Sequence, residues 1–113
     1  MVQDFHNKFK QPVLDKPSLA PGDREDFRYS LMAEEVKEYN DAVKNKDLVD
    51  IADSLADTLY AVYGTILEHG LQDKIEEIFE EVHKSNMSKE YSQYKLIKGL
   101  GFKLPDIKKI LDK

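Results

Sequence analysis

The sequence contains no cysteine, which excludes a disulfide framework, a thiolate metal site and a cysteine nucleophile. No apolar run approaches the length of a transmembrane span, and no secretory hydrophobic segment opens the chain. A Gly-rich phosphate loop and a nucleophile elbow are also missing. We therefore expect a cytoplasmic protein with no membrane partner, whose chemistry depends on neither thiols nor a phosphate loop.

Charge is unevenly distributed along the 113 residues, a length that suits one domain. The net charge is −5, yet residues 1–83 carry 9 Lys and Arg against 19 Asp and Glu, and residues 84–113 carry 8 against 3. The acidic body argues against nucleic acid as a partner. The basic segment suits either an anion-binding stretch or a tail that packs on the acidic body.

Helical periodicity predicts an all-α fold. A short helix is expected over residues 2–10, followed by a Pro-rich loop over 11–22. Asp23 is predicted to cap a second helix that ends near Lys44. Asp47 should cap a third helix over residues 48–69, which Gly70 ends.

The rest of the chain is expected to add two shorter helices. Asp73 should cap a helix over residues 74–87, and Pro105 suits the first turn of a short final helix. Residues 88–104 show no clear helical period. The result is one domain over residues 1–113, a four-helix bundle with its core at about 2–89 and a basic C-terminal extension at 90–113.

This bundle is expected to form a homo-oligomer, because so few helices bury little core alone. The second half of the third helix is apolar almost all round, which places the interface there. The residues on more than one face are Leu59, Ala61, Val62, Ile66 and Leu67.

Acidic residues gather on the faces of both long helices. Glu34, Glu35 and Glu38 continue an apolar stripe of the second helix, while Asp50, Asp53 and Asp57 share an arc of roughly 60° on the third. Buried carboxylates are costly unless a cation compensates them, and oxygen ligands suit Mg²⁺ or Mn²⁺. The alternative is a solvated acidic face, which is stronger for the third helix because its acids oppose the apolar stripe.

Two further patterns carry chemistry. Glu80 and His83 form one Glu-x-x-His pair of the kind that binds two irons, but a second pair is missing. Lys84, Asn86 and Lys89, with neighbouring serines, form a segment suited to phosphate oxygens. Residue types alone slightly favour the alternative, a plain polar helix end.

These motifs resemble the MazG-like all-α nucleotide pyrophosphohydrolases, which include phosphoribosyl-ATP pyrophosphohydrolase and the dCTP/dUTP pyrophosphatases. Residues 34–38 match the family pattern EExxE, and residues 55–60 look like its second half, ExxD, with Asp57 at the closing position. Ser54 stands where the family has Glu, so Asp53, or Asp50 in another register, would supply the missing carboxylate. Residues 2–6, 63–65 and 81–89 are also similar to a MazG-like subgroup.

The resemblance implies hydrolysis of a nucleoside triphosphate between its α- and β-phosphates, as part of nucleotide house-cleaning, by a homodimer or homotetramer. It implies Mg²⁺ held by Glu35, Glu38, Asp53 and Asp57, with Glu34 as a base or second-metal ligand. The residues implied in substrate binding are Phe5, His6, Arg28, Lys84, Asn86 and Lys89. A non-catalytic bundle with a degenerate metal site remains the alternative.

Overall fold

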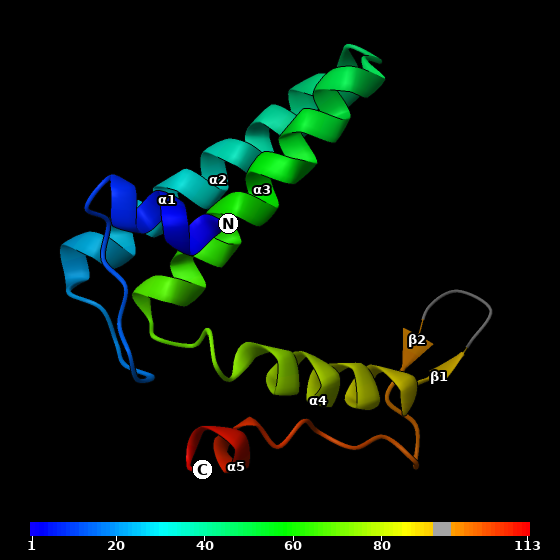
Figure 1. The fold of residues 1–113 in the computed structure, drawn as a ribbon. Helices are drawn as coiled ribbons and strands as arrows, with labels where there is room; N and C mark the ends of the chain where they lie inside the picture. The colour runs from blue at the N-terminus through cyan, green and yellow to red at the C-terminus, as the bar shows by residue number, and fades with distance from the viewer. Residues whose placement is uncertain (92–95) are drawn as a thin grey trace. The chain divides into compact units, whose positions relative to one another are not determined.

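The computed structural model describes residues 1–91 and 96–113, and the chain is mostly helical, which confirms the predicted all-α fold (Figure 1). Its helices are α1 (Val2–Lys8), α2 (Gly22–Lys44), α3 (Leu48–Glu68), α4 (Ile75–Met87) and α5 (Ile107–Leu111). One difference lies between α4 and α5, where Glu90–Tyr91 (β1) pairs with Leu96–Ile97 (β2) in an antiparallel ladder. Part of the predicted C-terminal extension, residues 92–95, lies outside the described residues.

The chain forms two compact units, residues 1–71 and residues 72–113. In the second unit Ile110 of α5 is buried, and Lys113 forms an ion pair with Glu77 of α4. The backbone N–H of Asp106 also donates to Glu81 Oε1 of α4 at 3.1 Å. None of the helices within residues 1–91 and 96–113 combines the length and the apolar character that crossing a membrane requires.

Both ends of α3 are formed by the residues that the sequence predicts, Asp47 and Gly70. The backbone N–H of Asp50 donates to the side chain of Asp47 at 3.2 Å, which confirms the predicted cap. At the other end Gly70 adopts φ +65°, and the N–H groups of Gly70 and Leu71 donate to Leu67 O and Ile66 O at 3.1 and 3.0 Å. This pair of bonds satisfies carbonyls that the helix end would otherwise leave free.

Two predicted caps are wrong. The helix α2 starts two residues earlier than a cap at Asp23 predicts, after Pro21, whose carbonyl accepts from Arg24 N and Glu25 N at 2.9 and 3.1 Å. Asp23 therefore lies inside the first turn, where a negative charge still favours the helix dipole. Lys74 occupies the position before α4 without a side-chain cap, so Asp73 does not cap that helix. In α5 the cap is Asp106, which places Pro105 outside the helix.

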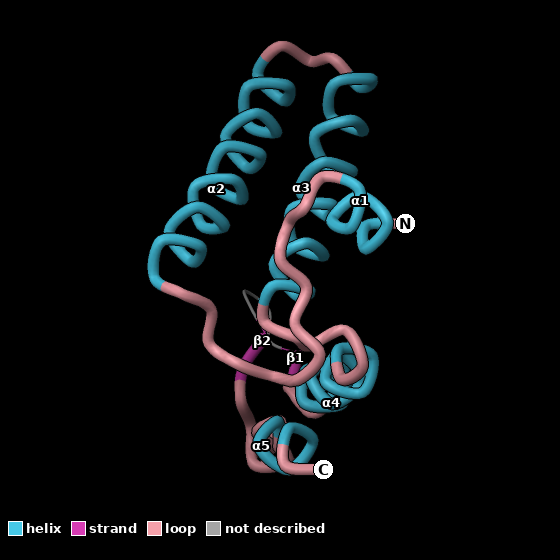
Figure 2. The backbone as a smooth tube through the Cα atoms, turned by 60° about the vertical axis from the view of Figure 1, so that its left-hand side comes forward, coloured by secondary structure: helices cyan, strands magenta, loops and turns pink. Residues whose placement is uncertain are grey.

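Helices α2 and α3 run antiparallel side by side, joined by the turn at residues 45–47 (Figure 2). Their facing positions recur at alternating intervals of four and three residues, the spacing that keeps one helix face against a partner. On α2 these positions are Arg24, Arg28, Leu31, Glu35, Glu38 and Ala42, and on α3 they are Asp50, Ser54, Asp57, Ala61, Gly64 and Glu68. These positions thus hold mostly small and charged side chains, with Leu31 the one large apolar residue among them, and Met32 of α2 also contacts α3, where Thr65 Oγ1 lies 3.8 Å from its sulfur.

The apolar stripe of α3 points away from this seam, so the acids of α3, which oppose the stripe as expected, lie on the side that packs on α2. Leu48, Leu55 and Leu59 remain 76%, 49% and 54% exposed. Ser54, Ala61 and Gly64 instead are buried on the acidic side of the helix. The alternative of a fully solvated acidic face is therefore wrong for this helix, and the pattern does not reveal the packing because small residues carry little hydrophobic signal.

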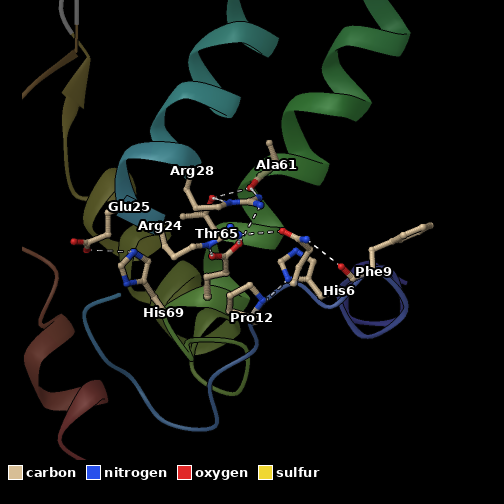
Figure 3. A network of polar contacts seen from close by, with 11 residues as sticks. His6, Phe9, Pro12, Arg24, Glu25, Arg28, Ala61, Thr65 and His69 are labelled. Atoms are coloured by element: carbon tan, nitrogen blue, oxygen red, sulfur yellow. Dashed lines mark hydrogen bonds and ion pairs between the residues drawn. The ribbon is translucent and has the colours of Figure 1, made fainter. Parts of the chain in front are cut away.

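At the base of the seam, where Arg24 and Arg28 project from α2 (Figure 3), Glu68 is buried with 1% of its surface exposed. Arg24 Nε and Nη2 donate to its two carboxylate oxygens, each at 2.9 Å, and Arg28 Nη1 lies 3.2 Å from Oε2. Bidentate pairing of this kind fixes geometry as well as charge. We call Arg24, Arg28 and Glu68 the charge clamp, since they join α2 to α3.

Replacing Glu68 by Gln should destabilise the protein strongly, because the buried guanidinium of Arg28 loses its counter-charge. Breaking one partner of a buried ion pair typically costs about 3 kcal/mol or more. The free energy of unfolding from urea denaturation at equal protein concentration measures the effect. Asp26→Asn is the matched control, since Asp26 is an exposed carboxylate on α2. Equal losses in the two variants would contradict the structural role of the clamp.

Candidate metal and nucleotide site

Three carboxylates converge across the α2–α3 seam. Glu35 and Glu38 come from successive turns of α2 and Asp57 from α3, and each offers an oxygen within 4.8 Å of the others. They occupy facing positions of the seam, so the packing of the two helices brings them together. We call Glu35, Glu38 and Asp57 the carboxylate trio.

Within the trio, Glu35 is the carboxylate whose ionised form is most disfavoured by its surroundings. Its Oε2 is buried and has no hydrogen-bond partner. Burial, followed by the negative charge of Glu38 and then of Asp57, raises the pKa of Glu35 from 4.5 to about 7. An unsatisfied buried oxygen among like charges is what a bound divalent cation would relieve. Three carboxylates without histidine or thiolate form a hard-oxygen donor set, which fits Mg²⁺ or Mn²⁺.

The other predicted metal residues lie beside the trio and not in it. Glu34 is exposed on α2. Asp53 is also exposed and lines a neighbouring hollow of about 270 Å³ together with Glu38 and Asp50. Ser54, at the position where the family pattern has Glu, is buried in the seam with 6% exposure. The metal roles of Asp53 and Glu34 therefore stay predictions.

A second hollow of about 230 Å³ adjoins the trio on its other side. Its wall includes Glu35 and Asp57 of the trio, and the other residues lining it are Phe5, His6, Arg28, Leu31, Tyr60 and Ala61. Phe5 meets Tyr60 edge to face, with ring centroids 5.5 Å apart. We call this the aromatic hollow. Aromatic walls beside a carboxylate cluster suit a ligand with a flat ring and phosphates.

Both predicted substrate residues of α1, Phe5 and His6, line the aromatic hollow. Phe9, which follows the helix, packs on Phe5 at 4.8 Å between ring centroids. His6 is only 2% exposed, and its Nδ1 lies 2.9 Å from Pro12 O. A carbonyl only accepts, so Nδ1 carries the proton and Nε2 of the neutral ring is an acceptor. A side chain at Gly64 would approach Nε2 to 2.8 Å, so glycine is needed there.

The guanidinium of Arg28 forms part of the hollow wall but is held mainly by the protein. Its Nε donates to Thr65 Oγ1 at 3.0 Å and its Nη2 to Ala61 O at 2.7 Å, in addition to the contact with Glu68. Burial, which outweighs the nearby Glu68 charge, lowers the pKa of Arg28 from its ordinary value. Its position is thus fixed before any ligand binds.

Sequence reasoning missed the importance of Tyr60, Glu68 and Arg24. Tyr60 lies one turn after Asp57 on the same face, and this spacing was the available signal. Arg24 and Arg28 are also one turn apart on α2, a pairing that points to a shared anionic partner. No spacing identifies that partner as Glu68, which lies 44 residues from Arg24 along the chain.

The residues predicted to bind phosphate, Lys84, Asn86 and Lys89, belong to the second unit. Lys84 and Asn86 are exposed near the end of α4, and Lys89 is half-buried. Ser88 Oγ donates to Ser85 O at 2.6 Å and accepts from the backbone N–H of Lys103 at 2.9 Å. These bonds make the segment a helix end tied to the chain that follows it.

Comparison with known proteins identifies one family. A family model described as phosphoribosyl-ATP pyrophosphohydrolase matches residues 2–86. The matched range runs from α1 to the end of α4 and includes the carboxylate trio, the charge clamp and the aromatic hollow. Comparison with curated proteins gives no match.

The raised pKa of Glu35 predicts an unusual pH dependence. A carboxylate with a folded-state pKa of about 7 stabilises the fold below its ordinary value of 4.5, and this contribution is lost as pH rises through 7. Metal-free protein should therefore unfold more readily in urea at pH 8 than at pH 6, and Glu35→Gln should remove that part of the difference. With Mg²⁺ the trend should reverse, because the cation binds the ionised trio. An identical pH dependence in variant and wild type would contradict this assignment.

Proposed function

The chain belongs to the phosphoribosyl-ATP pyrophosphohydrolase family, and we propose on that basis that it is a Mg²⁺-dependent nucleoside triphosphate pyrophosphohydrolase. Family membership makes it a hydrolase of phosphoanhydride bonds in a nucleotide-like substrate. The proposed reaction adds water across the bond between the α- and β-phosphates and releases a nucleoside monophosphate and pyrophosphate. House-cleaning of nucleotide pools is the proposed role.

The carboxylate trio is the observation that carries this proposal. Glu35, Glu38 and Asp57 would hold the cation, and Asp53 is proposed to complete the ligand set from the adjoining hollow. When bound, Mg²⁺ neutralises charge on the phosphates and lowers the pKa of a coordinated water. Glu34 is the proposed base for the proton that this water gives up, and its exposure and its position directly before Glu35 in α2 support the proposal.

The aromatic hollow is the proposed place of the nucleobase. Phe5 and Tyr60 offer aromatic surface, and His6 Nε2 offers an acceptor near the fixed guanidinium of Arg28. A flat base that stacks on these rings brings its phosphates toward Glu35 and Asp57, which line the same hollow. Adjacency of base and metal sites is the geometry that a nucleotide requires.

Product analysis tests the proposed function. Canonical and modified nucleoside triphosphates, and phosphoribosyl-ATP, are incubated with and without Mg²⁺, and monophosphate and pyrophosphate are quantified. Release of monophosphate and pyrophosphate in equal amounts when Mg²⁺ is present, and not when it is absent, supports the proposal. The second candidate is a non-catalytic binding relative, favoured by the buried Ser54 in place of a family Glu. That candidate predicts nucleotide binding without pyrophosphate release.

Glu38→Gln should slow hydrolysis strongly without harming the fold. Loss of a metal-binding carboxylate is expected to lower kcat/KM on the order of 100-fold. The metal-free variant should be as stable as wild type or more so, because one charge is removed from a repelling cluster. Kinetics and urea denaturation are measured together, with Asp26→Asn as control. Hydrolysis at the original rate would exclude Glu38 as a metal ligand.

Lys84, Asn86 and Lys89 are proposed to contact the phosphates or sugar. The basic balance of residues 84–113 and the start of this segment inside the family match support the assignment. Lys89→Ala should then raise KM, or lower kcat if the contact strengthens in the transition state. Lys108→Ala is the matched control, since Lys108 pairs with Asp112 within α5 at 2.7 Å. Equal kinetics in the two variants would leave residues 84–89 as a plain helix end.

We also propose that the working protein is a homodimer or homotetramer that covers the apolar stripe of α3. Leu48, Leu55 and Leu59 are exposed in a single chain, and contiguous apolar surface of this kind is typical of interfaces. Sedimentation at micromolar concentration should show an oligomer, and Leu59→Glu should shift it toward monomer because the charge would be buried. A monomeric wild-type protein would refute this proposal.

A further inference from the structure

The segment that follows α1 is connected to the charge clamp by a hydrogen bond of Gln11. The backbone N–H of Gln11 donates to His6 O at 2.8 Å, and its Nε2 donates to Phe9 O at 3.1 Å. Its Oε1 accepts from Arg24 Nη2 at 3.0 Å. One half-buried side chain thus closes the C-terminal end of α1 and connects it to α2.

The hydrogen bonds of Arg24 extend this connection to a residue that lines the aromatic hollow. The same Nη2 that donates to Gln11 also donates to Glu68, which Arg28 contacts in turn. Arg28 lines the hollow together with Phe5 and His6 of α1, and a side chain at Gly64 would meet both Arg28 Nη2 and His6 Nε2. Polar contacts through Arg24 and Glu68 therefore connect Gln11 with Arg28 of the hollow lining.

The α1 wall depends on such anchoring. A helix of seven residues is too short to be stable alone in water, so its position must come from tertiary contacts. His6 fits against Gly64, Phe5 against Tyr60, and Gln11 against the clamp. Of these anchors, Gln11 lies outside both the carboxylate trio and the lining of the aromatic hollow.

We propose that Gln11 is a positioning residue for nucleotide binding, which holds the α1 wall of the aromatic hollow through Arg24. The inference rests on the proposed function and adds to it a residue that touches neither substrate nor metal. A change at Gln11 should alter substrate affinity, because Gln11 holds the α1 residues that line the aromatic hollow. Metal affinity should be unaffected, because the trio is held by α2 and α3 alone.

Gln11→Leu tests the inference, since leucine has a similar size but neither donates nor accepts. Hydrogen bonds to charged groups are among the stronger ones, so KM is expected to rise about tenfold, with kcat within about twofold of wild type. The Kd for Mn²⁺, measured by electron paramagnetic resonance, should stay unchanged. Hydrogen exchange of the α1 amides should become faster, while that of α3 should not.

Two further variants sharpen the result. Gln11→Glu keeps an acceptor for Arg24 but loses the donor to Phe9 O, so it should restore most of the lost affinity if the Arg24 contact is what matters. Gln3→Leu is the control, because it makes the same change at an exposed position of α1. It should leave KM and exchange rates at wild-type values.

Equal KM values for Gln11→Leu and Gln3→Leu would overturn the positioning role while leaving the proposed function intact. A Gln11→Leu protein that loses kcat and Mn²⁺ affinity along with KM would also overturn it, since the defect would then be general. A wild-type protein that hydrolyses no nucleotide would refute the proposed function itself, and this inference with it. Kinetics of the wild type therefore separate the two failures.

Discussion

The buried carboxylate of Glu68, held by Arg24 and Arg28, is the constraint on which the rest of the first unit depends. A buried charge is costly unless its partners are correctly placed, and here the partners lie on the opposite helix. Only one pairing of α2 with α3 satisfies all three groups. That pairing brings Glu35, one heptad beyond Arg28, to the level of Asp57, about three turns before Glu68.

Charge along the seam therefore changes character from one end to the other. At the base, opposite charges neutralise each other inside the protein, whereas farther along the carboxylate trio leaves like charges together and one oxygen of Glu35 without a partner. The paired charges stabilise the helix pair. The like charges of the carboxylate trio repel one another, and a bound cation would relieve this repulsion. Since small and charged residues occupy most facing positions of the seam, Leu48, Leu55 and Leu59 of α3 stay exposed, whereas Leu67 is buried.

Much of this could be predicted from the sequence where local signals decide. The bounds of α3 follow from Asp47 and Gly70, and the trio follows from acidic residues at helical spacing. The direction in which the apolar stripe of α3 faces could not be predicted, because a seam of Ala, Gly and Ser has almost no hydrophobic signal. The Arg24–Glu68 contact and the role of Gln11 depend on tertiary pairing, and a two-residue strand pair is too short to give a pattern. The predicted caps at Asp23 and Asp73 are wrong, because the helices start after Pro21 and Lys74, where no side-chain cap is formed.

Paramagnetic broadening of backbone resonances by Mn²⁺ tests the central claim most directly, namely that the seam holds a divalent cation at one defined place. Substoichiometric Mn²⁺ is added to the isotope-labelled protein, and the loss of each amide signal is followed. The account predicts that signals of Glu35, Glu38 and Asp57 disappear first, that those around Arg24 and Glu68 persist longer, and that excess Mg²⁺ restores the lost signals. Preferential loss at the exposed acids Asp26 and Asp47, which lie near opposite ends of the helix pair, or uniform broadening along both helices, would contradict it.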